Sequence, residues 1–154
     1  MLGAYQDFLA VVAAHREFTP ITAWVLRLNL LKASRRIEQI TRESNSNSYS
    51  YNVAFATSDV CESAGNVISL LLAILVEEKQ RIDIEALSPH RHTTIANSLE
   101  EAIDSYLDCP RSLEKAYDVI YYIKCLLSYH KVDFTGLVIE KWEQDIKLWE
   151  QDIQ

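Results

Sequence analysis

Two short segments place polar side chains at helical spacing within otherwise apolar sequence. In the segment ESAGNV, Glu62 and Asn66 are four residues apart and therefore lie on one face of a helix. In the segment EKAYDVIYY, Glu114 and Asp118 have the same spacing and again share a face. Each segment therefore offers acidic or amide oxygens at the edge of an apolar helix.

The chemistry that these residues suggest is binding of a divalent cation. If the two helices pack antiparallel, their polar faces can meet and gather three carboxylates, those of Glu62, Glu114 and Asp118. Facing carboxylates repel one another unless a cation joins them, and clusters rich in oxygen suit Mg²⁺ or Mn²⁺. The alternative is that both pairs face solvent near helix N-termini, where acidic residues are common.

The elements that must position these residues are helices. Apolar residues recur with a 3.6-residue period in about six segments, and Ser44 to Tyr51 is a polar loop without a period. The expected helices run from Ala4 to Arg16, from Thr19-Pro20 to Glu43, from Asn52 or Thr57 to Lys79, from Thr93 to Leu107, from Ser112 to Tyr129, and from Asp133 to the C-terminus. The third is apolar nearly all round between Val67 and Val76, which places it in the middle of a bundle.

The composition agrees with one helical domain. The chain has 154 residues, of which 49% are hydrophobic, and only three are Gly and three Pro. A β-rich protein of this length needs many tight turns, which require Gly, Pro or Asn. We therefore predict an all-α bundle of five to six helices, with residues 1–154 forming a single domain.

The net charge, the cysteines and the apolar runs indicate which partners and which compartment to expect. The net charge of −7 works against nucleic-acid binding, which needs clustered Lys and Arg. The three cysteines are scattered and form no CxxC pair, as expected of reduced thiols in a cytoplasmic protein. The apolar run from Val67 to Val76 is half the ~20 residues that a membrane helix requires, so no membrane span is expected.

Two blocks of the sequence, together about 60 residues, resemble a known family. The run EKAYDVIYYI, the connection SYHKVDF and the run LVIEKWEQ resemble the second half of the MazG-like, all-α nucleoside triphosphate pyrophosphohydrolases, and ESAGNV is similar to their first acidic motif. The resemblance implies cleavage of the α–β phosphoanhydride of a nucleotide. It also implies divalent ions held by carboxylates from both helices, and assembly into dimers or dimers of dimers.

This sequence matches the metal-binding motifs of the family only in part. Glu62 and Glu114 match the first Glu of each family motif, but the four positions that ligate metal in the family hold Ser63, Asn66, Lys115 and Asp118 here. Ser and Asn offer neutral oxygens, whereas a Lys would repel a metal or bind a phosphate in its place. We therefore assign Ser63, Asn66 and Lys115 to ligand binding and Glu62, Glu114 and Asp118 to metal binding.

A longer separation between the motifs is a second departure from the family. The segment between them contains an extra expected helix, on which Glu101 and Asp104 offer another acidic face. Those residues could replace lost ligands, or they could form a solvated face.

Three hypotheses follow. The first is a divergent MazG-like protein that binds a nucleotide or another phosphorylated ligand with weak or lost pyrophosphohydrolase activity, and this one we favour. The second is an active, metal-dependent enzyme with a rearranged site. The third is a helical protein–protein interaction module unrelated to nucleotides. In each case the apolar stripe around Trp142 and Trp149 and the Tyr-rich stretch predict a homo-oligomer, with a dimer as the simplest form.

Overall fold

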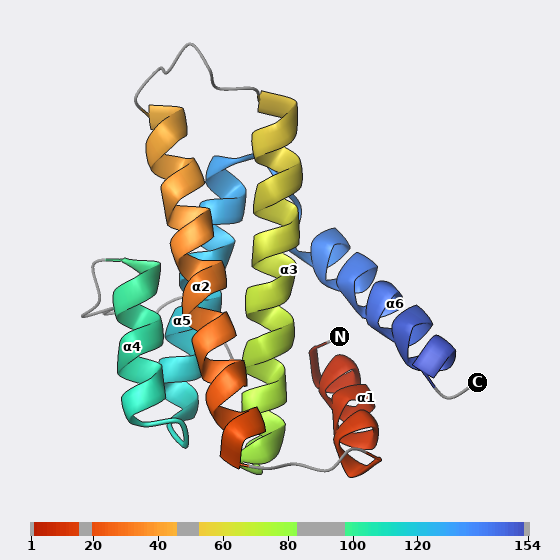
Figure 1. The fold of residues 1–154 in the computed structure, drawn as a ribbon. Coiled ribbons are helices and arrows are strands. Elements are labelled where there is room, and N and C mark those ends of the chain that lie inside the picture. Colours follow the sequence, from red (N-terminus) through yellow and green to blue (C-terminus); the bar gives the residue numbers. More distant parts are fainter. Residues whose placement is uncertain (1, 16–19, 46–52, 83–97, 153–154) are drawn as a thin grey trace.

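The computed structural model confirms an all-α bundle (Figure 1). It describes residues 2–15, 20–45, 53–82 and 98–152, and this part of the chain contains no strand. Its six helices are α1 (Leu2–Ala14), α2 (Pro20–Asn45), α3 (Val53–Glu77), α4 (Leu99–Asp108), α5 (Leu113–Tyr129) and α6 (Phe134–Asp152). The expected loop from Ser44 onward and the expected start of a helix at Thr93 fall largely outside the described residues.

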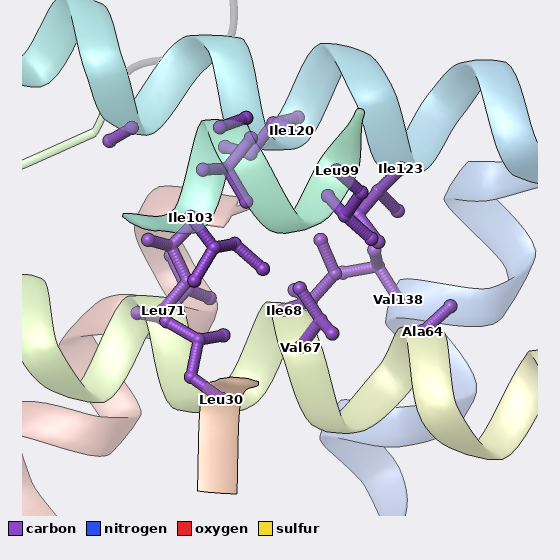
Figure 2. Close-up of a cluster of buried hydrophobic side chains, with 14 of the residues drawn as sticks. Leu30, Ala64, Val67, Ile68, Leu71, Leu99, Ile103, Ile120, Ile123 and Val138 are labelled. Atoms are coloured by element: carbon purple, nitrogen blue, oxygen red, sulfur yellow. The ribbon is translucent and has the colours of Figure 1, made fainter. Parts of the chain in front are cut away.

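The central helix is α3, as its apolar sequence predicts. It packs against α1, α2, α5 and α6, and most of its side chains between Val60 and Leu75 are buried. Figure 2 shows the core where α3 meets α4 and α5, with Ile68 and Leu71 facing Ile103 and Ile120. A helix that is apolar nearly all round is expected to have several neighbours, and α3 contacts four other helices.

Two layers flank α3 (Figure 1). Helices α2, α4 and α5 pack together on one side of it, whereas α1 and α6 lie on the other side. Helices α3 and α5 run in opposite directions, so the start of α5 lies beside the end of α3. An ion pair between Arg111, just before α5, and Glu78, just after α3, spans 3.5 Å at that end of the bundle.

Helix α1 is attached through the segment that follows α3. Buried Gln6 donates from Nε2 to the carbonyl of Gln80 at 2.5 Å, and its Oε1 accepts the backbone N–H of Ile82 at 3.0 Å. Beside it, Asp7 forms an ion pair with Arg81. A side-chain amide that satisfies a backbone donor and a backbone acceptor removes the cost of burying them without partners.

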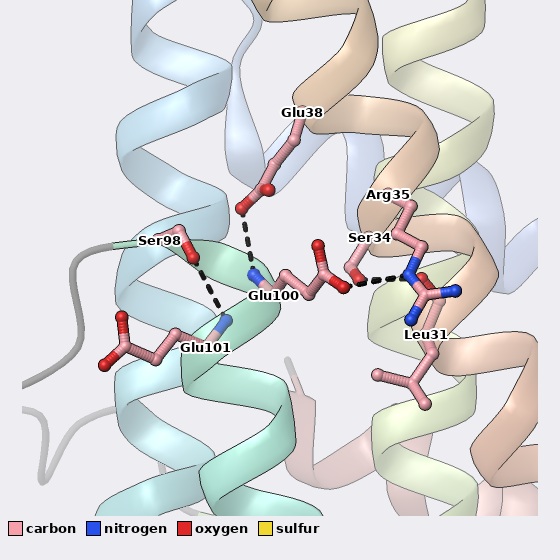
Figure 3. A network of polar contacts seen from close by, with 7 residues as sticks. All are labelled: Leu31, Ser34, Arg35, Glu38, Ser98, Glu100 and Glu101. Carbon is pink, nitrogen blue, oxygen red and sulfur yellow. Dashed lines mark hydrogen bonds and ion pairs between the residues drawn. The ribbon is translucent and has the colours of Figure 1, made fainter.

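Helix α4 begins with two separate caps (Figure 3). Ser98 accepts the backbone N–H of Glu101 at 3.1 Å, and Glu38 of α2 accepts the backbone N–H of Glu100 at 2.9 Å. Arg35 then pairs with the Glu100 carboxylate at 2.9 Å. A carboxylate at a helix N-terminus satisfies free N–H groups and interacts favourably with the helix dipole, so α2 fixes where α4 starts.

One helix also passes a test for membrane spans. The segment Ser58–Glu77 is 20 residues long and apolar enough to cross a bilayer, a longer stretch than the run from Val67 to Val76 suggests. More than half of it is buried within the bundle, and the core helix of a soluble protein meets the same criterion. The apolar character of α3 is therefore explained by its central position.

Candidate functional site

A polar cavity lies between α3 and α6. It has a volume of about 370 Å³, within the range of small-molecule sites. Helix α3 contributes Ser58, Cys61, Glu62 and Asn66 to its wall, and α6 contributes Leu137, Glu140, Lys141 and Gln144. Two of the six residues expected to form a site, Glu62 and Asn66, thus line one cavity together.

A glycine on α3 sets how closely α6 approaches this cavity. A Cβ atom on Gly65 would lie 3.2 Å from Cδ of Lys141, closer than most real Cβ contacts. Because Gly65 has no side chain, the aliphatic part of Lys141 lies across α3 at this point. Next to it on α6, Leu137 and Val138 are buried in the core and hold the helix in place.

The carboxylate of Asp145 connects α6 with α1 and α3. Asp145 of α6 accepts hydrogen bonds from the hydroxyl groups of Tyr5 on α1 and Ser69 on α3, the latter at 3.1 Å. Its other oxygen lies 3.4 Å from Nζ of Lys141. Burial and the hydrogen bond to Asp145 raise the pKa of Tyr5. The phenol therefore stays neutral and acts as a donor.

The electrostatics of the cavity are negative. Among the described residues, Glu62 and Glu140 have no ion-pair partner, whereas Lys141 already has Asp145. Burial and the charge of Glu140 raise the pKa of the Cys61 thiol, so the Glu140 carboxylate lies within electrostatic reach of α3. Two carboxylates from facing helices without a counter-charge favour a ligand that brings a cation with it.

The second acidic segment lies away from the cavity, at the end of the bundle where α3 ends. Glu114, Lys115 and Asp118 are in the first turns of α5, beside the end of α3 where Arg111 meets Glu78. Glu62 lies about 24 Å from Glu78 along the axis of α3, from the rise of ~1.5 Å per residue. Within one chain the structure therefore does not bring Glu62 together with Glu114 and Asp118.

The physical reason is the antiparallel packing itself. Glu62 lies near the middle of α3, whereas Glu114 and Asp118 lie in the first turns of α5, which antiparallel packing places beside the end of α3. Glu114 is exposed and Asp118 half-buried. In the parts of the chain that the structure describes, no group of three or more His, Cys, Asp or Glu side chains is placed to hold a metal. Metal binding by these three carboxylates stays a prediction.

The residues expected to bind a ligand also separate. Nζ of Lys115 lies 3.4 Å from the carbonyl oxygen of Ser105 and so connects α5 to α4. Ser63 is buried on α3, and Asn66 is half-buried at the cavity wall. On α4, Glu101 and Asp104 are exposed. Of these side chains, only that of Asn66 lines the α3–α6 cavity.

Sequence reasoning missed the contribution of α6. Glu140 and Gln144 are four residues apart, the spacing that singled out the other two segments, so the same signal was present. The amphipathic pattern of α6 hid it, because charged residues on the wet face of a terminal helix are expected in any case. No family model, no curated protein and no solved structure matches the chain.

Proposed function

We propose that the α3–α6 cavity binds a nucleotide, or another phosphorylated ligand, together with Mg²⁺ or Mn²⁺, and that pyrophosphohydrolase activity is weak or lost. The observation that carries the proposal is that Glu62 and Asn66 share one polar cavity with Glu140 of the facing helix. The resemblance of the first acidic segment to the MazG-like enzymes supports the choice of a nucleotide.

The charges of the cavity support binding of a cation–phosphate complex over either partner alone. Mg²⁺ is usually bound through one or two carboxylates, with phosphate oxygens and water completing its octahedron. Glu62 and Glu140 could supply those carboxylates, and a free phosphate would be repelled by them. The amides of Asn66 and Gln144 offer donors and acceptors to the organic part of the ligand.

Weak or absent turnover follows from the separation of the two acidic segments. Hydrolysis of a phosphoanhydride requires that metal ions neutralise the phosphates and position a water for attack. The resemblance assigns that work to carboxylates of both segments, yet Glu114 and Asp118 lie far from the cavity within one chain. The alternative, an active enzyme with a rearranged site, predicts metal-dependent release of pyrophosphate, which a direct assay detects.

The test is calorimetric titration with a panel of ribo- and deoxyribonucleoside triphosphates, with and without Mg²⁺. We expect binding only with Mg²⁺, and Glu62→Gln and Glu140→Gln should each weaken it about tenfold, or ~1.4 kcal/mol. Glu143→Gln is the matched control, because Glu143 is exposed on α6 and does not line the cavity. Absence of binding by the wild-type protein to every triphosphate would refute the choice of a nucleotide.

A second candidate is a helical interaction module, which the exposed apolar side chains favour. Trp24 is 63% exposed, Leu148 58% and Val11 52%, on three different helices. Apolar side chains that gather in one exposed patch mark surfaces that associate. We propose a homo-oligomer, and sedimentation velocity at micromolar concentration tests it, since a monomer would contradict it.

A further inference from the structure

The wall of the α3–α6 cavity contains one basic side chain among its described residues, that of Lys141. Its ammonium group pairs outside the cavity, because Nζ lies 3.4 Å from Oδ1 of Asp145, which is one turn further along α6 and does not line the wall. The acidic side chains of the wall, Glu62 and Glu140, form no ion pair with any described residue. The lysine thus has carboxylates on two sides and pairs with only one of them.

The Lys141 side chain crosses α3 at Gly65 to reach this partner. Its Cδ, Cγ and Cβ atoms lie 3.2, 3.3 and 3.5 Å from the position that a Cβ atom on Gly65 would take. Glu62 lies three residues before Gly65, and residues at that spacing are neighbours on one face of a helix. The flexible four-carbon stem of a lysine therefore allows its ammonium group to turn toward the cavity carboxylates.

Asp145 is the stronger partner because it is enclosed. The side chains of Lys141 and Asp145 are 20% and 15% exposed, whereas Glu62 and Glu140 are exposed to solvent. Water and salt screen the attraction between an ammonium group and an exposed carboxylate, and they screen an enclosed pair much less. The lysine is therefore held at Asp145.

Hydrogen bonds also fix the Asp145 carboxylate in place. The hydroxyl groups of Tyr5 on α1 and Ser69 on α3 both donate to Oδ2, which leaves Oδ1 to Lys141. A carboxylate that two other helices already hold loses little further freedom when it pairs with a cation. The contact of Lys141 with Asp145 therefore depends on α1 and α3 as well as on α6.

We propose that Asp145 is a positioning residue for the cavity: it holds Lys141 away from Glu62 and Glu140, and so leaves both carboxylates available to a divalent cation. Asp145 acts through the lysine and does not touch the ligand. Without its charge, the ammonium group would turn to the cavity carboxylates and compete with the metal. This inference rests on the proposed function, because it explains why the cavity of that proposal is not neutralised by its own lysine.

The first test needs no metal. Asp145→Asn removes the charge that holds Lys141 but keeps an oxygen for the two hydroxyl groups. In thermal unfolding with EDTA, Glu140→Gln should not lower Tm of the wild-type protein, whereas in the Asp145→Asn background it should lower Tm, because it removes a new partner of the lysine. Exposed Glu143→Gln is the control and should act equally in both backgrounds. Equal effects of Glu140→Gln in the two backgrounds would overturn the proposal.

The second test is titration with Mn²⁺ alone, in which EPR measures the free ion. Asp145→Asn should bind Mn²⁺ about tenfold more weakly than the wild-type protein. Adding Lys141→Met should restore most of the affinity, because methionine keeps an unbranched stem over Gly65 without the charge. A loss that Lys141→Met does not rescue would show that Asp145 acts through packing, which would overturn the proposal.

The outcomes separate this inference from the proposed function. If the wild-type protein binds Mn²⁺ and Asp145→Asn binds it equally well, only the role of Asp145 fails. If the wild-type protein binds no Mn²⁺, the two carboxylates do not form a cation site, and the cation of the proposed function fails as well. If Asp145→Asn does not fold, Lys141→Met alone decides: Mn²⁺ affinity should change little, and a large rise would show that the lysine already occupies the cavity.

Discussion

Two regions of α3 carry the same kinds of side chain in different surroundings. In its middle part, Glu62 and Asn66 line an open polar cavity and have α6 opposite them. At its end, Glu78 pairs with Arg27 of α2 and with Arg111 from the turn before α5. A carboxylate is therefore available to a ligand or held by the fold according to what packs against it. Helix position alone does not decide this.

The largest expected effect comes from removing the Asp145 carboxylate, which connects α6 with α1 and α3. Asp145→Ala would leave Tyr5 and Lys141 without their partner, and the side chains of Lys141 and Asp145 are only 20% and 15% exposed. We expect a loss of about 2 to 4 kcal/mol in the free energy of unfolding. Chemical denaturation measures it. An equal loss in Glu143→Ala, on the exposed face of the same helix, would contradict the assignment.

A larger side chain at Gly65 should disturb the packing of α6 against α3, which forms the cavity. Because a Cβ there already comes within 3.2 Å of Lys141, Gly65→Leu must push α6 away from α3. We expect about 1 to 3 kcal/mol of destabilisation, with loss of any ligand affinity of the cavity. The matched control is Gly65→Ala, since the flexible Lys141 side chain can move aside by a few tenths of an ångström. Equal effects of Leu and Ala would show that contact with α6 does not matter.

The smallest expected effect is a pH dependence of stability that comes from His130, at the end of the bundle where α5 ends. His130 follows α5, and its Nε2 lies 3.0 Å from the Thr41 hydroxyl, which itself donates to the carbonyl of Ile37. Burial lowers the pKa of His130 below its usual 6.5. The unfolded chain therefore binds the proton first, and stability is lost as the pH falls below 6.5.

Thermal unfolding of His130→Gln from pH 5 to 7.5 should show a flatter acid limb than the wild-type protein, by less than ~1 kcal/mol in stability. Exposed His15 provides the control variant, His15→Gln. If His130→Gln loses as much stability at low pH as the wild-type protein, then protonation of His130 does not cause that loss.

Much of the fold could be predicted from periodicity and capping residues. The all-α class, the central place of α3 and the start of the second helix at Pro20 are confirmed. Ser112 caps α5 as the expected first residue of that segment, by accepting the N–H of Lys115 at 3.3 Å. These features depend on local sequence, and local sequence is what a periodic pattern reports.

The site was harder to predict because it depends on direction and distance. Glu62 and Asn66 were identified by spacing, but spacing within a helix says nothing of which end of the next helix lies opposite. Antiparallel packing separates Glu114 from Glu62. The carboxylate that faces Glu62 across the cavity is instead Glu140 of α6. The close approach of Lys141 to Gly65 is a contact between residues far apart in the chain, and no local pattern indicates it.

The hydrogen bonds of α1 have a consequence for the order of events during synthesis. Gln6 binds the backbone of Gln80, 74 residues further on, and Tyr5 binds Asp145, 140 residues away. Helix α1 is therefore synthesised long before α6, and the Tyr5 hydroxyl lacks its Asp145 partner until α6 has followed. Until α6 packs, α1 has α3 and the segment after α3 as its neighbours, so the contacts between α1 and α6 form late during synthesis.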